Sequence, residues 1–293
     1  MNWWKRLKGR LKAEEPLKRH TTLRTGGPVK FFIQPADTRD LKLLITCSKR
    51  YKIPLSVIGA GSNILAGDKR LRRMVVSLSS PCFKEIAFKG NLVEAGSGLM
   101  LAKLVSETAR RGLSGAEFLS GIPGTLGGAL VMNAGAWGSQ ISKMVMKIRV
   151  MDSRGRIRTL SREKIDFAYR KSNLEKFIIL GATLKFFQRK QRKIRQDIER
   201  YRRQRRILQD RSFPSAGCIF RNPPGDYAGR LIDLCGLKGR ACGGARISSK
   251  HANFILNRKN GRAADILKLM KLVEKEVKDN FKINLQPEIK IWQ

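Results

Sequence analysis

Two glycine-rich segments have the residue types and the spacing of loops that bind phosphate. The first, Gly59-Ala60-Gly61-Ser62-Asn63, follows a short apolar run, and its glycines let successive backbone N–H groups turn toward one concavity. It is not a dinucleotide-binding fingerprint, because the sixth position is Ile64 rather than glycine. Taken alone, this segment is also compatible with a tight turn that binds nothing.

The second segment, Gly121–Ala129, predicts a ligand more strongly. Four of its first eight residues are glycine, and Pro123 fixes one φ angle. Such a density of glycine costs conformational entropy that a core strand would not recover. From Gly128 onward a helix can begin, with its N-terminal N–H groups facing an anion. Because the two loops lie about sixty residues apart, they suggest one elongated ligand with a diphosphate, such as a dinucleotide.

The hydrophobic pattern predicts alternating strands and helices that would hold these loops. Composition changes at Phe213-Pro214, after a strongly basic helical run at 189–206, so we place a domain boundary near residue 190. The expected strands are Val29–Ile33, Leu55–Ile58, Met74–Leu78, Ile86–Phe88, Leu92–Ala95, a hairpin over 148–160, Phe177–Phe187, Ala252–Leu256 and the extended segment Leu285–Trp292. The expected helices are Asp37–Arg50, Leu99–Arg111, 189–206, Tyr227–Cys235 and Ala263–Asn280.

Positive charge is spread over the whole chain. The 293 residues carry a net charge of +38, of which residues 1–19 supply +5 and residues 189–206 supply +8. The +25 that remains excludes a basic arm attached to a neutral domain, and no nucleic-acid recognition motif is present, so we expect no specific nucleic-acid partner. A hydrophobic fraction of 42% excludes a wholly disordered polybasic protein.

Other protein classes are disfavoured by particular residues. The longest uncharged stretch, Phe118–Ser142, contains six glycines and a proline, which is not typical of a membrane span. Trp3, Leu7 and Leu11 have helical spacing, so residues 1–12 could form an amphipathic helix that either touches an anionic membrane or packs on the protein body. Five cysteines without a secretory segment favour the cytoplasm. With only two histidines, a His-based metal site or a Ser-His-Asp triad has almost no candidates.

Further segments, taken in order with the two loops, resemble the UDP-N-acetylenolpyruvoylglucosamine reductases of bacterial peptidoglycan synthesis. The resemblance extends from Glu15 to Trp292, and the compact region after Ser215 is similar to the shorter of the family's two subtypes. A set of ordered motifs is far more specific than any single one. The motifs are Pro16–Thr22 with Gly26-Gly27, Gly59–Asn63, Gly121–Gly128, Phe167–Ser172, Ser215–Pro223, Ala228–Asp233, Leu237–Gly239, Gly243–Ala245, His251–Phe254 and Leu285–Glu288.

The resemblance implies an α+β protein with an FAD-binding fold of the vanillyl-alcohol-oxidase (PCMH) type and a C-terminal substrate domain. The expected parts are a basic N-terminal helix (1–16), FAD-binding subdomains at 17–80 and 81–190, the latter including a return strand (284–293), and a UDP-sugar-binding domain (191–283). We expect a monomer. Non-covalent FAD would be held by Gly59, Ala60, Gly61, Ser62, Asn63, Ile64, Gly121, Ile122, Pro123, Gly124, Thr125, Gly127, Gly128, Asn133 and Gly135.

The implied reaction reduces a carbon–carbon double bond, with NADPH as hydride source and FAD as carrier. Negative charge develops on the adjacent carbon and spreads into the substrate carboxylate, so the site needs a cation and an acid that protonates this carbon. The matching residues are Arg170, whose fork suits a carboxylate, Cys218 as proton donor and Glu288 as acidic partner. Cys218 departs from the family's serine, but a thiol is a stronger acid than a hydroxyl. A cysteine that merely packs, with Ser215 as the donor, remains open. Tyr169, Asn222 and His251 align with positions expected to contact the UDP-sugar.

Two alternatives remain. Another FAD oxidoreductase of the same fold would explain the glycine loops, but not Arg170, Cys218 and Glu288 together. A polyanion-binding protein on a degenerate enzyme scaffold would explain the charge of +38.

Overall fold

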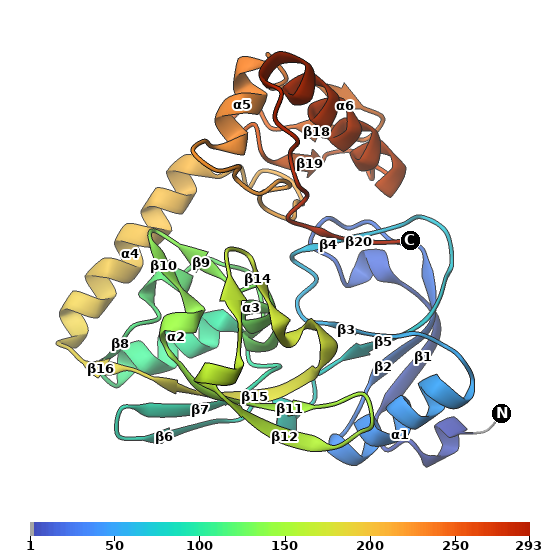
Figure 1. The fold of residues 1–293 in the computed structure, drawn as a ribbon, viewed down its shortest axis with the longest axis vertical. Coiled ribbons are helices and arrows are strands. Elements are labelled where there is room, and N and C mark those ends of the chain that lie inside the picture. The colour runs from blue at the N-terminus through green and yellow to red at the C-terminus, as the bar shows by residue number, and fades with distance from the viewer. Residues whose placement is uncertain (1–2) are drawn as a thin grey trace. The chain divides into compact units, whose positions relative to one another are not determined.

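The computed structural model describes residues 3–293, which fall into two compact units (Figure 1). The boundary that we expected near residue 190 lies instead between Arg203 and Gln204, inside helix α4 (Gln191–Leu208). Each unit combines segments that are distant in the sequence. Unit 1 contains the residues up to Ala13, Phe31–Ala60 and Arg72–Arg203, and unit 2 contains Glu14–Lys30, Gly61–Leu71 and Gln204–Gln293.

The N-terminal helix predicted from the spacing of its apolar residues is not formed. Trp3–Arg6 make a single 3-10 turn, and Arg10–Pro16 form strand β1; the first two residues of the expected helix lie outside the described part. The carboxylate of Asp40 explains the change, because it accepts hydrogen bonds from the backbone N–H groups of Lys8 (3.1 Å) and Gly9 (2.8 Å). These bonds hold the backbone extended where a helix would have continued.

The first sheet has four strands in the order β1-β2-β5-β3, and β3 runs parallel to β5. Helix α1 packs its apolar side chains Leu41, Leu44 and Ile45 into the core of this sheet. Asp37 begins the helix, since its carboxylate accepts from the N–H groups of the first turn. The elements are β2 (Pro28–Gln34), α1 (Thr38–Arg50), β3 (Leu55–Ile58) and β5 (Leu71–Ser77).

The second sheet has five antiparallel strands in the order β12-β11-β15-β7-β6. Helices α2 and α3 cover one face of it (Figure 1), and Leu101 and Leu104 of α2 are buried with Val93 and Ile148 of the sheet. The elements are β6 (Ile86–Lys89), β7 (Leu92–Gly96), α2 (Leu101–Arg110), α3 (Leu126–Val131), β11 (Val145–Met151), β12 (Ile157–Ser161) and β15 (Ile178–Lys185).

Three short strand pairs complete unit 1. They are β9 (Gly135–Ala136) with β10 (Ser139–Gln140), β13 (Phe167–Ala168) with β14 (Lys171–Ser172), and β8 (Leu113–Ser114) with β16 (Phe187–Gln188).

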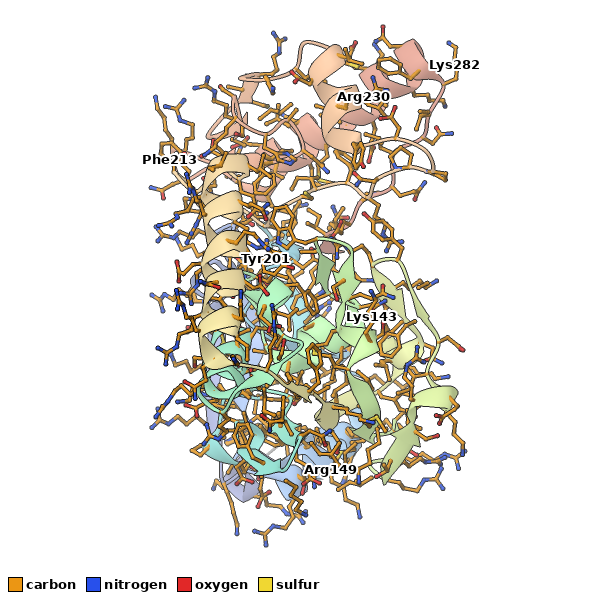
Figure 2. All side chains as sticks on the ribbon, turned by 90° about the vertical axis from the view of Figure 1, so that its left-hand side faces the viewer. Lys143, Arg149, Tyr201, Phe213, Arg230 and Lys282 are labelled. Carbon is orange, nitrogen blue, oxygen red and sulfur yellow. The ribbon has the colours of Figure 1, made fainter. Side chains whose placement is uncertain are left out.

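Helix α4 carries many more cations than its few acidic residues can pair. Asp197 pairs with Arg189 at 2.6 Å and with Arg200 at 2.8 Å, and Glu199 pairs with Arg202 at 2.9 Å. Figure 2 shows nitrogen-tipped side chains along α4 and over the surfaces of both units. The basic character is therefore not specific to this helix, as the sequence predicted.

Unit 2 is built around helix α6 (Ala263–Phe281), whose apolar face packs with α5 (Ala228–Leu234) and a three-stranded sheet in the order β17-β18-β19. The carboxylate of Asp68 accepts hydrogen bonds from the N–H groups of Ala263 (2.8 Å) and Ala264 (3.0 Å), which satisfies the N-terminus of α6. The strands are β17 (Ala241–Cys242), β18 (Ala245–Ile247) and β19 (Ile255–Asn257).

The end of the chain returns to the first glycine loop. Strand β20 (Lys290–Trp292) pairs in parallel with β4 (Ile64–Ala66), the strand that directly follows Asn63. We had expected this return strand to lie with residues 81–190, whereas it lies in unit 2 with β4.

Candidate active site

The second glycine loop ends at the N-terminus of α3. The helix begins at Leu126, two residues before the predicted start at Gly128, because Thr125 is its N-cap and its Oγ1 accepts a hydrogen bond of 3.4 Å from the N–H of Gly128. A Cβ atom on Gly128 would meet only this oxygen, at 3.6 Å. Gly121 and Gly128 are exposed, so the backbone of the loop is open to a ligand.

The first glycine loop approaches the second one closely in unit 1. A Cβ atom on Gly59 would lie 2.5 Å from Oγ1 of Thr125, so only glycine fits beside the N-cap of α3. On the other side of the second loop, the N–H of Gly127 donates to the carbonyl of Ser97 at 2.8 Å. The structure thus brings Gly59 and the Gly121–Gly128 loop together, as expected for one ligand held by both.

The rest of the first loop, from Gly61 onward, belongs to unit 2. Gly61 has a φ of +65°, and a Cβ atom there would lie 1.9 Å from the carbonyl oxygen of His20, so this position also requires glycine. Its own carbonyl accepts from the N–H of Thr22 at 3.1 Å. The segment around His20, which was part of the sequence motif, therefore forms the support of the loop.

Two buried hydroxyl groups test whether these loops fit a phosphate-bearing cofactor. Ser97, whose carbonyl binds Gly127, and Ser120, which precedes Gly121, are 3% and 2% exposed. Among the residues that the structure describes, neither Oγ atom has a hydrogen-bond partner. Buried hydroxyls are usually paired, so these residues fit a ligand with phosphate oxygens, such as FAD. Sequence reasoning missed both serines, because a single serine beside a glycine carries no signal of its own.

Arg170 lies at the turn between β13 and β14. Its φ is +54°, a conformation that side-chain-bearing residues rarely adopt, and its Nη1 donates a hydrogen bond of 2.7 Å to the carbonyl of Gly135. Its guanidinium lies 5.4 Å from the ring centre of Tyr169, which is 53% exposed. The turn thus holds a cation and an exposed aromatic ring side by side.

Asn133 joins the β13–β14 turn to the β9–β10 hairpin. It is 1% exposed, and its side-chain amide donates to the carbonyl of Ala168 and to Oε1 of Gln140, both at 3.0 Å. Its Oδ1 accepts from the N–H of Ser142 at 3.3 Å. Asn133 and Gly135, which we expected to bind the cofactor, are seen to hold Arg170 and the turn that carries it.

Cys218 and Glu288 come together in unit 2, although they are distant in the sequence. The N–H of Glu288 donates a hydrogen bond of 2.7 Å to the carbonyl of Ile219, the residue after Cys218. The two segments pair again where Phe220 and Pro287 form an antiparallel bridge. Both Cys218 and Glu288 are half-buried, so each is sheltered but accessible.

Asn253 fixes the other side of the Cys218 segment. Its Oδ1 accepts from the N–H of Phe220 at 2.9 Å, and its Nδ2 donates to the carbonyl of Phe220 at 2.8 Å. Its backbone carbonyl accepts from the N–H of Ile219 at 2.9 Å. We assigned no role to Asn253 from the sequence. A polar amide between the apolar residues Ala252 and Phe254 is the feature that could have indicated one.

The other expected substrate contacts are also held within unit 2. Oδ1 of Asn222 accepts from the N–H of Ala228 at 3.1 Å, at the start of α5. The ring of His251 packs 4.7 Å from that of Phe254, and its Nδ1 accepts from the N–H of Asn253 at 3.3 Å. Burial, with a smaller effect of the positive Lys238, lowers the pKa of His251. Its imidazole is therefore neutral at pH 7.

Residues 3–293 contain neither a cluster of metal ligands nor a helix that could span a membrane. No group of three or more histidine, cysteine, aspartate or glutamate side chains could hold a metal ion. No helix in the same range is both long and apolar enough to cross a bilayer.

Comparison with known proteins assigns a family to each of two segments of the chain. Residues 29–161 match the FAD binding domain family, and residues 209–292 match the C-terminal domain family of UDP-N-acetylenolpyruvoylglucosamine reductase. UDP-N-acetylenolpyruvoylglucosamine reductase 2 from Symbiobacterium thermophilum is 40% identical over 286 residues, which cover 97% of this chain and 92% of that protein. The chain belongs to the UDP-N-acetylenolpyruvoylglucosamine reductase family. The Bacillus subtilis member of the family is 37% identical over 97% of this chain and 94% of its own length.

Solved structures agree with this assignment. The crystal structure of the Thermus caldophilus UDP-N-acetylenolpyruvylglucosamine reductase covers 98% of this chain and 100% of its own, with a TM-score of 0.84 and 35% identity. The 6-hydroxy-D-nicotine oxidase from Arthrobacter nicotinovorans shares only the fold, with a TM-score of 0.51 and 15% identity over 62% of this chain and 43% of its own. The predicted α+β fold of the FAD-binding PCMH type, and the predicted membership of the reductase family, are confirmed.

Proposed function

We propose that this protein reduces UDP-N-acetylenolpyruvoylglucosamine to UDP-N-acetylmuramate, a step of peptidoglycan precursor synthesis, with NADPH as the hydride source. Membership of the reductase family supports the reaction. The structural observation that carries the proposal is the hydrogen bond between the N–H of Glu288 and the carbonyl of Ile219. It brings two groups able to exchange protons, the Cys218 thiol and the Glu288 carboxyl, onto neighbouring segments.

The two glycine loops hold the cofactor. Backbone groups of Gly59 and of the Gly121–Gly128 loop, with the hydroxyls of Ser97 and Ser120, bind its diphosphate at the N-terminus of α3. When bound, FAD supplies the two-electron chemistry between NADPH and the enolpyruvyl double bond.

Arg170 stabilises the charge that develops on the substrate. Addition of hydride to the terminal carbon leaves an electron pair on the adjacent carbon, which spreads into the carboxylate. The guanidinium faces this carboxylate and lowers the energy of the charged state. Because the carbonyl of Gly135 already binds Nη1, the cation is held in place before the substrate arrives.

Cys218 completes the reduction by giving its thiol proton to the carbon that carries the electron pair. The thiolate that remains takes up a proton from water before the next turnover. Glu288 shares a proton with the substrate carboxylate, which favours the enolic form while the charge is present. Tyr169, Asn222 and His251 contact the UDP-sugar.

The proposal includes the state and location of the protein. We expect a monomer that works in the cytoplasm and that touches anionic membrane surfaces weakly through residues 1–12. In the described part of this segment Trp4 is 40% exposed and is followed by the cations Lys5, Arg6 and Lys8. Trp3, by contrast, is buried in the core of unit 1 with Leu7 and Leu11 packed against it, so the contact would use Trp4 and these cations.

Stopped-flow absorbance of the purified yellow protein tests the reaction. We expect NADPH, and not NADH, to bleach the flavin, and the enolpyruvyl UDP-sugar to restore its colour within one turnover. A flavin that NADPH reduces but that the UDP-sugar does not reoxidise would point to another oxidoreductase of the same fold. Colourless protein that binds RNA with a steep dependence on salt would instead support a polyanion-binding protein.

A further inference from the structure

The β9–β10 hairpin has an unusual turn. Its two central residues, Trp137 and Gly138, both have positive φ angles, +57° and +73°. A turn of this kind favours Asn-Gly, because a bulky side chain at positive φ is strained. Tryptophan at the first position therefore requires contacts that hold it there.

Two contacts from outside the hairpin hold this turn. The ring of Trp137 stacks on the ring of Tyr201 in α4, with centres 5.9 Å apart and planes inclined by 14°. Nζ of Lys143 donates to the carbonyl of Gly138 at 3.1 Å. Tyr201 and Lys143 are labelled in Figure 2. The stack of the two rings thereby attaches the hairpin to α4.

The base of the same hairpin binds the side chain of Arg170 from the β13–β14 turn. Its Nη1 binds the carbonyl of Gly135, the first residue of β9, at 2.7 Å. Asn133 binds both Gln140 of β10 and Ala168 next to the Arg170 turn. Asn133, Trp137 and Arg170 all have positive φ angles, so three residues in this uncommon conformation belong to one connected group.

We propose that the stack of Trp137 on Tyr201 is a clamp that positions Arg170 for the reduction of the double bond. This inference rests on the proposed function, since it assigns Trp137 and Tyr201 to the same reaction as positioning residues. The clamp fixes the hairpin, the hairpin fixes the carbonyl of Gly135, and that carbonyl fixes the guanidinium. A displacement of about 1 Å at a reacting group can slow a reaction up to about a hundredfold.

The burial of the two rings distinguishes a clamp from ordinary core packing. Trp137 is 38% exposed and lies outside the buried core of unit 1, and Tyr201 only borders that core. The stack therefore adds little to the stability of the fold. Its loss should release the hairpin without unfolding the protein.

The experiment compares Tyr201→Ala with Tyr201→Phe, which keeps the stacking ring. Stopped-flow absorbance measures flavin reduction by NADPH and reoxidation by the UDP-sugar separately. We expect Tyr201→Ala to slow reoxidation by roughly ten- to a hundredfold and to leave reduction by NADPH unchanged. Tyr201→Phe should reoxidise at the rate of the wild type. Hydrogen exchange on the protein without added ligands should become faster at residues 134–142 in Tyr201→Ala alone.

Ile198→Ala serves as the control for a general loss of stability. Ile198 is 7% exposed on the same helix and packs in the core. This variant should lower the melting temperature but leave exchange at residues 134–142 close to that of the wild type. If Tyr201→Ala does not fold, Trp137→Ala removes the other ring without changing α4, and the same results are expected.

Several results would overturn the clamp. These are wild-type reoxidation in Tyr201→Ala, a defect in Tyr201→Phe equal to that of alanine, or unchanged exchange at residues 134–142. If the UDP-sugar fails to reoxidise the wild-type flavin, the proposed function is wrong. In that case the exchange measurement alone decides whether the two rings hold the hairpin.

Discussion

The side-chain amide of Asn63 donates a hydrogen bond of 3.1 Å to the backbone carbonyl of Glu288. The carbonyl of Asn63 in turn accepts from the N–H of Lys290 at 2.9 Å. Asn63 of the first glycine loop therefore holds the segment that contains Glu288 at two points. In the proposed cofactor site, Asn63 would thus link FAD binding to the position of Glu288.

Asn63→Ala should weaken two properties at once. Loss of a part-buried hydrogen bond of this kind costs about 0.5–1.5 kcal/mol, so we expect FAD binding weaker by up to roughly tenfold and a similar decrease in the rate of reoxidation. Flavin fluorescence and stopped-flow absorbance measure the two. Asn63→Asp keeps the size but not the donor and should not restore either property. A decrease in FAD affinity alone would contradict the link to Glu288.

Substitution of Cys218 tests the proton donor. Cys218→Ser keeps a protic group and should retain turnover within about tenfold, whereas Cys218→Ala should lose about 10²–10⁴-fold of the rate of reoxidation. Reduction of the flavin by NADPH should be unaffected in both variants and serves as the internal control. An alanine variant as active as the wild type would show that the thiol only packs, and Ser215→Ala would then test the alternative donor.

Two glycine substitutions distinguish a glycine required by packing within the protein from a glycine required by cofactor binding. In Gly59→Ala the new methyl would lie 2.5 Å from Oγ1 of Thr125, so we expect a lower melting temperature of the flavin-free protein. In Gly128→Ala the nearest protein atom is the same oxygen at 3.6 Å, so the flavin-free protein should keep its melting temperature. FAD affinity should nevertheless fall at least tenfold, because the methyl takes the ligand's place. Unchanged FAD affinity in Gly128→Ala would remove this loop from the cofactor site.

His251 should make stability depend on pH in a defined direction. Burial lowers its pKa below the ordinary value of 6.5, with Lys238 as a smaller cause. The unfolded chain therefore takes up a proton at a higher pH than the folded one. The free energy of unfolding should fall as the pH decreases through 6.5 toward the lowered pKa, with nothing further lost below it.

Urea unfolding at pH 7.5 and 5.5 measures this effect. His251→Gln keeps an acceptor for the N–H of Asn253 but cannot be protonated. The decrease in the urea midpoint between the two pH values should be smaller in this variant than in the wild type. Equal decreases would show that protonation of His251 does not contribute.

The sequence predicted most of the elements because their signals are local. Helix α1 begins directly after Asp37, the predicted first residue, and the first glycine loop directly follows the expected strand Leu55–Ile58. The predicted N-terminal helix was wrong because the structure of this segment depends on Asp40, a distant residue whose carboxylate binds the backbone at Lys8 and Gly9. Apolar spacing alone cannot report a competing hydrogen-bond acceptor from another element.

The site divides in the same way. Arg170, Cys218 and Glu288 could be named because they lie in ordered motifs, and their roles stay predictions. The neighbours that position them could not be named. Asn253 binds both sides of Phe220, and Tyr201 stacks on Trp137, through contacts between residues that are remote in the chain. Tyr201 also lies within an arginine-rich helix, where a single aromatic residue does not indicate a contact with the β9–β10 hairpin.

The parallel pairing of Lys290 with Ile64 has a consequence for the synthesis of this protein on the ribosome. At about 5–20 residues per second, on the order of ten seconds or more separates translation of β4 from that of the strand beside it. Until then the nascent chain exposes a strand edge that invites the wrong partner. Because Glu288 emerges with the same stretch, a prematurely terminated product lacks both the closing strand and the acid, and cannot act as a half-competent enzyme.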